Sequence, residues 1–153
     1  MVQASGPARE KKMLIAFSMA AERYGLEWQA VAAVAPLAKL AEAPGPHSAL
    51  SGLLDYHGAK IPVVDLCRLI LGRPCSRHFS TRILIVDVPL GRVGLMVERA
   101  NETVDLLDAP VRGDGVYLFR IAGEEGQEVT DKEIELGRLL GQVLRSSFPG
   151  AAP

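Results

Sequence analysis

The sequence predicts a mainly β, barrel-like fold with short helices and one helix at the C-terminus. Short runs of strand-forming residues recur through residue 121, and turn residues separate them about every 8–12 residues. After residue 130 the apolar residues change to a helical period. The 153 residues suit one domain of ordinary size, long enough to bury a core without disulfides or metal.

The first predicted elements are a pair of strands. Residues 13–19 are a short apolar run rich in strand formers, and residues 23–27 alternate back after a turn at Ala21. Downstream, four apolar residues beginning at Trp28 have the spacing i, i+3, i+4, i+7. A short helix over residues 28–35 is therefore possible before the loop that begins at residue 43.

The clearest hairpin spans residues 53–66. Gly58 supplies the positive φ that a tight turn needs. Pro62 cannot donate a hydrogen bond to a neighbouring strand, so we expect it at a sheet edge or a bulge. A short helical turn over residues 67–71 should follow and stop at Gly72.

A second hairpin pairs residues 81–88 with residues 92–98. Its first strand contains a continuous apolar run at residues 83–86, which indicates a strand buried on both faces. Residues 103–106 and 116–121 are predicted to be further short strands.

The C-terminal segment is predicted to be an amphipathic helix. Thr130 and Glu133 have the spacing of a capping box, which would start the helix there. One apolar stripe follows at helical spacing: Leu136, Leu139, Leu140, Val143 and Leu144. Gly137 and Gly141 each disfavour a helix by about 1 kcal/mol, so they are candidate sites of close approach to another backbone.

Composition and charge exclude several classes of protein. Hydrophobic residues are 48% and charged residues 23%, the balance of a globular domain. The net charge of −1 argues against a general polyanion binder, although residues 1–100 sum to +4 and residues 101–153 to −5. The chain contains no run of 18 apolar residues and begins with a polar segment, so we expect neither a transmembrane helix nor a secretory signal.

The chemistry-bearing residues form no catalytic signature. No phosphate loop, dinucleotide fingerprint or nucleophile elbow occurs. Cys67 and Cys75 with His47, His57 and His78 could in principle bind zinc, but their spacings do not match paired zinc ligands. We therefore expect no catalytic residue, no metal and no cofactor, and we expect both thiols to be reduced in the cytoplasm.

One basic segment stands out between residues 67 and 82, which contain no acidic residue. Its members are Arg68, Arg73, Arg77 and Arg82, together with His78. The segment could be an ordinary solvated loop, or a docking patch for an acidic protein surface or a phosphate group. A small β-barrel with a basic loop could also bind nucleic acid. That alternative is weakened because aromatic residues are only 5% of the chain and Phe79 alone lies among the arginines.

Several motifs together resemble the CheW-like chemotaxis adaptor family. Residues 52–66, GLLDYHGAKIPVVDL, are similar to its central signature, in which a turn glycine precedes Pro, hydrophobic residues, Asp and Leu. RILIV and VGLMVE within residues 82–98 resemble its later hairpin, and residues 24–26 resemble an element of its opening strands. The resemblance covers residues 13–106 well and 107–145 loosely.

The resemblance implies two intertwined, SH3-like five-stranded β-barrels and a scaffolding role without enzymatic activity. The domain would span residues 13–146, between a flexible tail at 1–12 and another at 147–153. Its partners would be the regulatory domain of a histidine kinase and the cytoplasmic tip of a methyl-accepting chemoreceptor, with no nucleic acid and no direct membrane insertion. Residues 72–74 and 80–82 are more similar to adaptors of surface-sensing pathways than to those of flagellar pathways.

The resemblance also assigns two sets of site residues. The kinase-side or ring interface would contain Ala33, His57, Gly58, Pro62, Val63 and Asp65. The receptor groove would contain Val31, Val34, Val93, Met96 and Val104. The alternative for each apolar position is plain core packing. Typical members carry Glu and Arg where this chain has Ala33 and His57, so we expect an altered choice of partner.

Overall fold

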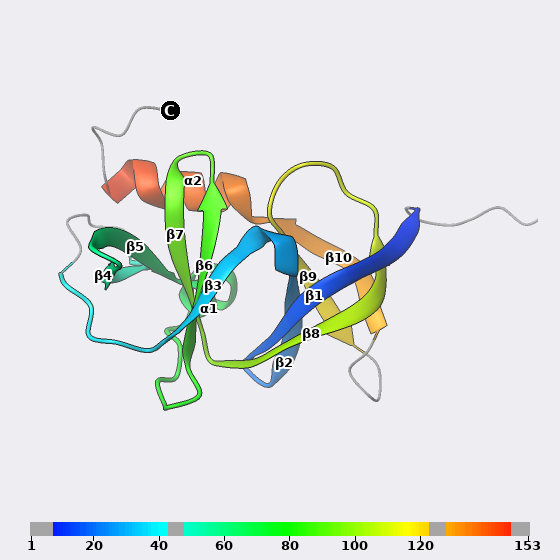
Figure 1. The fold of residues 1–153 in the computed structure, drawn as a ribbon, viewed down its shortest axis with the longest axis horizontal. Coiled ribbons are helices and arrows are strands. Elements are labelled where there is room, and N and C mark those ends of the chain that lie inside the picture. Colours follow the sequence, from blue (N-terminus) through cyan, green and yellow to red (C-terminus); the bar gives the residue numbers. More distant parts are fainter. Residues whose placement is uncertain (1–7, 43–47, 123–127, 148–153) are drawn as a thin grey trace, which may run out of the picture.

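The structure is a computed structural model that describes residues 8–42, 48–122 and 128–147. Two five-stranded sheets lie side by side and curl into two small barrels (Figure 1). The chain builds part of the first barrel, then the whole of the second, and returns to complete the first. The prediction of a mainly β fold with two intertwined SH3-like barrels is therefore confirmed.

We call the first barrel the terminal barrel because both ends of the chain form it. Its strand order is β10-β9-β2-β1-β8. The strands are β1 (Arg9–Met19), β2 (Glu22–Glu27), β8 (Arg99–Pro110), β9 (Tyr117–Ala122) and β10 (Glu128–Glu135). Strand β1 pairs with both β2 and β8, so it joins the N-terminal hairpin to the returning part of the chain.

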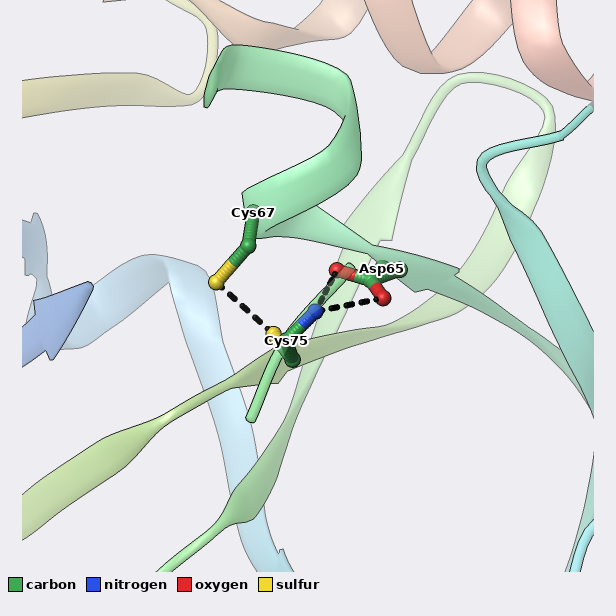
Figure 2. A group of neighbouring side chains, drawn as sticks. All are labelled: Asp65, Cys67 and Cys75. Carbon is green, nitrogen blue, oxygen red and sulfur yellow. Dashed lines mark hydrogen bonds between the residues drawn. The ribbon is translucent and has the colours of Figure 1, made fainter. Parts of the chain in front are cut away.

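The second barrel, which we call the central barrel, has the strand order β3-β6-β7-β5-β4. The strands are β3 (Val31–Pro36), β4 (Leu50–Tyr56), β5 (Ala59–Asp65), β6 (Arg82–Val88) and β7 (Gly91–Val97). Strands β5 and β7 pair in parallel from Val63 onward, and Pro62 lies just before that pairing begins. The lack of a backbone NH at Pro62 therefore removes no hydrogen bond between β5 and β7. Helix α1 (Leu66–Leu71) follows β5, and its start is drawn in Figure 2.

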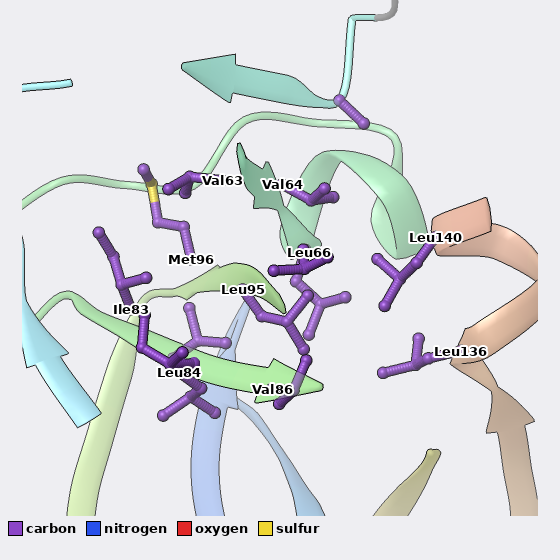
Figure 3. Close-up of a cluster of buried hydrophobic side chains, with 14 of the residues drawn as sticks. Val63, Val64, Leu66, Ile83, Leu84, Val86, Leu95, Met96, Leu136 and Leu140 are labelled. Carbon is purple, nitrogen blue, oxygen red and sulfur yellow. The ribbon is translucent and has the colours of Figure 1, made fainter. Parts of the chain in front are cut away.

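The main hydrophobic core fills the central barrel and continues between the two barrels. Strand β6 is buried on both faces, as predicted, because Ile83 to Val86 have no exposed surface. Figure 3 shows side chains of β5, β6 and β7 meeting Leu136 and Leu140 of helix α2 (Leu136–Ser147). A second, smaller core lies in the terminal barrel: Leu14, Ala16, Ala109, Phe119, Ile121 and Val129.

The possible helix over residues 28–35 is wrong. Only η1 (Trp28–Ala30) is helical, as one 3-10 turn, and Val31 already begins strand β3. Strand β3 pairs with β6, whose buried backbone groups need a partner on that side. This pairing overrides the helical spacing of four apolar side chains.

The capping box at Thr130 and Glu133 is also wrong, because residues 128–135 are strand β10. Helix α2 begins later, where a Glu135 carboxylate oxygen accepts a hydrogen bond from the Arg138 backbone NH at 2.9 Å. The predicted apolar stripe is confirmed, since four of its five residues are buried. A Cβ on Gly137 would meet the Glu135 carboxylate, so a side chain rather than another backbone approaches this glycine.

The terminal barrel starts before the predicted boundary at residue 13. Strand β1 begins at Arg9, which is paired with Pro110 of β8. The Arg9 guanidinium also forms ion pairs with Asp108 at 3.1 Å and with Asp131 at 2.6 Å. Residues 9–12, assigned to the tail, therefore lie in the sheet, while residues 1–7 and 148–153 are outside the described part. No helix among the described residues is long and apolar enough to span a membrane.

Candidate partner-binding surfaces

The β4–β5 turn presents one predicted site residue to solvent. His57 and Gly58 have φ angles of +51° and +83°, so the turn places an L-residue in the left-handed region. The His57 ring packs edge-on against Tyr56, with 4.2 Å between ring centroids. Both turn residues are exposed, and this tip is accessible to a partner.

The other predicted kinase-side residues are less accessible. Ala33 and Pro62 are half-buried, whereas Val63 and Asp65 are buried. Val63 belongs to the main core, and Asp65 holds the start of α1, so these two residues stabilise the barrel instead of offering a contact surface. Ala33 lies on β3, and the β4–β5 turn follows β4; these are the two edge strands of the central sheet.

Most of the predicted receptor-groove residues belong to the core. Val93 and Met96 have no exposed surface, so they cannot line a groove that a partner enters. Val31 and Val34 are half-buried and pack against the main core. Only Val104 is exposed, on strand β8. The core alternative was therefore the better interpretation of the β7 positions, because the parallel β5–β7 pairing encloses that strand.

An apolar surface does exist beside Val104, on residues that sequence reasoning did not single out. Met13 on β1 is directly opposite Leu106 on β8, and both side chains are exposed, Leu106 to 63%. Val104 is two residues from Leu106 and therefore lies on the same face. We call Met13, Val104 and Leu106 the β1–β8 apolar patch. The alternation of apolar and acidic residues over residues 104–106 was the available signal.

A buried carboxylate joins the basic segment to both barrels. Glu98 lies at the start of the crossing from β7 to β8 and is 7% exposed. Its oxygens accept hydrogen bonds from the Arg73 guanidinium at 2.9 and 3.2 Å, and from the backbone NH groups of Ser76 and Ala20, each at 2.7 Å. The hydrogen bond from Arg73 is the main reason that the pKa of Glu98 is lowered to about 2.

Glu98 also contacts a turn of unusual backbone geometry. Ala20 and Ala21 connect β1 to β2 with φ angles of +53° and +64°. Two successive non-glycine residues in the left-handed region are unfavourable. The hydrogen bond from the Ala20 NH to Glu98 offsets part of that cost.

The four arginines of the predicted basic docking patch do not act alike. Arg73 is engaged with Glu98, so it has a structural role. Arg82 donates hydrogen bonds to the carbonyl oxygens of Phe79 at 2.6 Å and Thr81 at 2.9 Å. Arg77 is exposed and Arg68 is half-buried in α1. The segment is therefore a formed loop and not four extended cations.

The same loop displays an aromatic side chain. Thr81 NH donates to the His78 carbonyl at 3.0 Å, and His78 NH donates to the Thr81 hydroxyl at 3.1 Å, which closes a turn over residues 78–81. Phe79 lies within this turn and is 96% exposed. The exposed Phe79 ring on this hydrogen-bonded turn is a second candidate contact surface.

A group of three potential ligands lies behind this loop. The ligand atoms of Asp65, Cys67 and Cys75 are within 4.8 Å of one another, and all three residues are buried (Figure 2). Asp65 caps α1 by accepting from the Arg68 NH at 3.0 Å. The hydrogen bond with Cys67, together with burial, raises the pKa of the Cys75 thiol far above its ordinary value. His57 and His78 are not in this group, and His47 is outside the described residues.

Comparison with solved structures supports this fold. The chain is similar to a structure described as the scaffolding protein TtCheW from Thermoanaerobacter tengcongensis, with 23% identity and a TM-score of 0.58. The match covers 82% of this chain and 83% of that one. A search of curated proteins found no match. A family model described as the CheW-like domain matches residues 13–125, well over half of the sequence. The chain therefore belongs to the CheW-like domain family.

Proposed function

We propose that this protein is a non-enzymatic adaptor that couples methyl-accepting chemoreceptors to a histidine kinase. Membership of the CheW-like family supports a role as a chemotaxis scaffold. The observation that carries the proposal is the β1–β8 apolar patch, a surface that a soluble domain exposes when it binds a partner. The protein would work in the cytoplasm and reach membrane receptor arrays through its partners.

The receptor contact is assigned to the β1–β8 apolar patch. Val104 is the one exposed member of the residues that the family resemblance assigns to the receptor groove, and Met13 and Leu106 extend the surface around it. Trp28 of η1 is exposed as well, and η1 contacts β1. Large apolar side chains on a rigid sheet suit the apolar face of a helical receptor tip.

The kinase contact is assigned to the β4–β5 turn, with Ala33 on the opposite edge strand. Two charges of typical family members are missing here together, because Ala33 and His57 replace them. A neutral pair removes charge complementarity from the interface. The chain should therefore prefer a kinase whose matching surface lacks the corresponding charges.

The receptor assignment is tested with purified protein and a soluble fragment of a receptor tip from the same genome. Leu106→Asp should lower the affinity for this fragment at least tenfold, because it places a charge in an apolar contact. Leu71→Asp is the matched control, since Leu71 is also an exposed leucine but lies on α1. An equal loss in both variants, or no binding by the wild type, would count against the assignment.

The kinase assignment is tested by pull-down with two regulatory domains. The domain encoded with this protein should bind, and one from a general chemotaxis kinase should bind more weakly. The double variant Ala33→Glu, His57→Arg restores the typical charges and should improve binding to the general kinase. Ordinary affinity of the wild type for the general kinase would contradict the altered choice of partner.

Nucleic-acid binding is the alternative function, and one observation favours it. Phe79 is exposed beside Arg77 and Arg82, so a base could stack on its ring. Arg73, however, is already paired with Glu98. Filter binding at two salt concentrations separates the two functions, because contacts with phosphates weaken steeply as salt rises. Tight, salt-dependent binding that is lost in Phe79→Ala would favour the nucleic-acid role.

A further inference from the structure

The two cysteines of this chain lie next to each other in the buried interior. Cys67 lies in the first turn of α1 and Cys75 in the segment that leads to β6. Their sulfur atoms are 2.8 Å apart, and the side chains point toward one another (Figure 2). The sequence contains no other cysteine.

We propose that Cys67 and Cys75 are a reversible dithiol–disulfide pair, oxidised by a small disulfide or a peroxide. A disulfide bond is about 2.05 Å long, so closing it requires the two sulfur atoms to approach by less than 1 Å. A tetrahedral zinc ion would instead hold two thiolates about 3.8 Å apart, because each Zn–S bond is about 2.3 Å. The observed separation is nearer to the bond than to the metal site.

The backbone around both cysteines is already held in place. The Cys75 NH donates to both carboxylate oxygens of Asp65, at 3.0 and 3.3 Å. The same carboxylate accepts from the Arg68 NH at the start of the helix that carries Cys67. One buried side chain therefore helps to fix the backbone of both cysteines relative to each other, with their sulfur atoms 2.8 Å apart.

The use of Asp65 as a backbone acceptor also argues against a metal. Each of its oxygens already accepts a backbone hydrogen bond, so ligation would compete with the cap of α1. Structural zinc sites in proteins have four protein ligands, whereas the group here supplies three. The two thiols are thus better suited to react with each other than to share an ion.

The oxidation balances with either oxidant. With a small disulfide, one cysteine thiolate attacks and releases one small thiol, and the second cysteine then attacks the mixed disulfide and releases another. With a peroxide, one sulfur becomes a sulfenic acid as water leaves, and the second thiol displaces a further water. In both cases the protein loses two electrons and two protons.

The protonation of the Cys75 thiol should limit the rate at which the two cysteines are oxidised. The thiolate is the nucleophile, and the pKa of the Cys75 thiol is raised by its hydrogen bond with Cys67 and by burial. The Cys75 sulfur also lies 3.4 Å from the Met96 carbonyl oxygen, which can accept the thiol hydrogen. The reaction should therefore be slow at neutral pH and faster as pH rises.

Oxidation would lock the α1–β6 connection. The residue after Cys75 is Ser76, whose NH binds Glu98, and Arg73 within the closed ring binds the same carboxylate. The bond would tie this segment covalently to α1 and leave its path unchanged. The turn over residues 78–81, which carries Phe79, follows directly after this segment. The disulfide would therefore restrict the motion of the chain that leads into that turn.

The test uses the full chain, equilibrated in buffers of reduced and oxidised glutathione at several ratios. Remaining thiols are then alkylated in denaturant and the intact mass is measured. Wild-type protein should convert to a monomer that carries no alkyl group and has lost two hydrogens, and dithiothreitol should reverse the change. Cys67→Ser and Cys75→Ser should instead give one alkyl group or one glutathione adduct.

Three results would overturn the proposal. The first is wild-type protein that keeps two alkylated thiols at every ratio, or that gains two glutathione adducts. The second is one zinc ion per chain, measured by elemental analysis, in the reduced protein and absent from Cys67→Ser. The third is an oxidised wild type whose thermal unfolding midpoint is not above that of the reduced form. Each readout is taken on the wild type first, so an unfolded variant does not weaken the test.

Discussion

The two barrels have the same number of strands but are stabilised differently. The central barrel shares a continuous apolar core with α2 and with the inner faces of β1 and β2. The terminal barrel has a second core of only six buried residues, and at its border Lys12 is buried with its ammonium 5.6 Å from the centre of the Phe119 ring. Burial of apolar surface therefore stabilises the central barrel more strongly.

The terminal barrel, with its small core, also contains several ion pairs between its strands and loops. Arg9 bridges β8 and β10, Arg112 pairs with Glu133, and Lys12 lies 3.5 Å from Glu27. The β1–β8 apolar patch is on this less apolar barrel. The proposed receptor surface is therefore on the barrel whose own core is the smaller one, and its exposed side chains can change with little effect on the main core.

The largest expected effect is a matched truncation in the two cores. Leu95 and Leu14 are both fully buried, the first in the main core and the second in the small core. Leu95→Ala should lower the free energy of unfolding by about 4 kcal/mol and Leu14→Ala by about 2 kcal/mol, because the smaller core can relax more readily. Urea denaturation measures both, and a larger cost for Leu14→Ala would reverse the comparison.

The next effect concerns Glu98, which links the barrels. Its pKa is lowered to about 2 from an ordinary value of 4.5, so the folded state holds a proton less readily than the unfolded state. The stabilisation is therefore complete above the ordinary pKa and is lost as pH falls through the folded one. Glu98→Gln should cost on the order of 2 kcal/mol at pH 7, less than the full shift implies because Arg73 is partly open to solvent.

This effect is measured by urea denaturation at several pH values between 7 and 2. The variant should show a flatter dependence on pH than the wild type below the ordinary pKa. Asp87→Asn is the matched control, because Asp87 also pairs with an arginine, Arg92, but is exposed. An equal loss of stability in the control would show that burial of Glu98 is not the cause.

A smaller difference is expected from one added methyl group in each barrel. A Cβ on Gly94 would lie 2.7 Å from a methyl of Ile83 and 3.2 Å from one of Val63 in the central barrel. A Cβ on Gly25 in the terminal barrel would lie 3.1 Å from Ile121. Gly94→Ala should cost about 1–3 kcal/mol and Gly25→Ala less, as calorimetry can show. A lower cost at Gly94 would mean that the central barrel is the more deformable one.

The smallest expected effect is a gain in stability. Ala21→Gly should stabilise the protein by about 1 kcal/mol, because glycine adopts the left-handed conformation of this turn without steric cost. Ala32→Gly, at an exposed strand position, should destabilise it instead. Thermal unfolding of both variants gives the comparison, and a loss of stability in Ala21→Gly would argue against a strained turn.

Local patterns predicted the elements that depend on few contacts. The two hairpins around Gly58 and Gly91, the doubly buried run at residues 83–86 and the stripe of α2 all follow from periodicity and turn residues. Prediction failed at Trp28 and Thr130, where helical signals lie in or beside segments that pair as strands. Strand pairing with a distant part of the chain decided both cases.

Local sequence patterns were enough to predict the fold class, the resemblance to the family and most of the strands, because period, turn residues and motif spacing are properties of neighbouring residues. Only the tertiary structure decided which residues are accessible. In the folded chain Val93 and Met96 are buried, and Arg73 is paired with Glu98. The side chains of Met13, Leu106 and Phe79 are exposed. Residues far apart in sequence make these contacts, so burial, charge pairing and the approach of Cys67 to Cys75 depend on how the two barrels interlock.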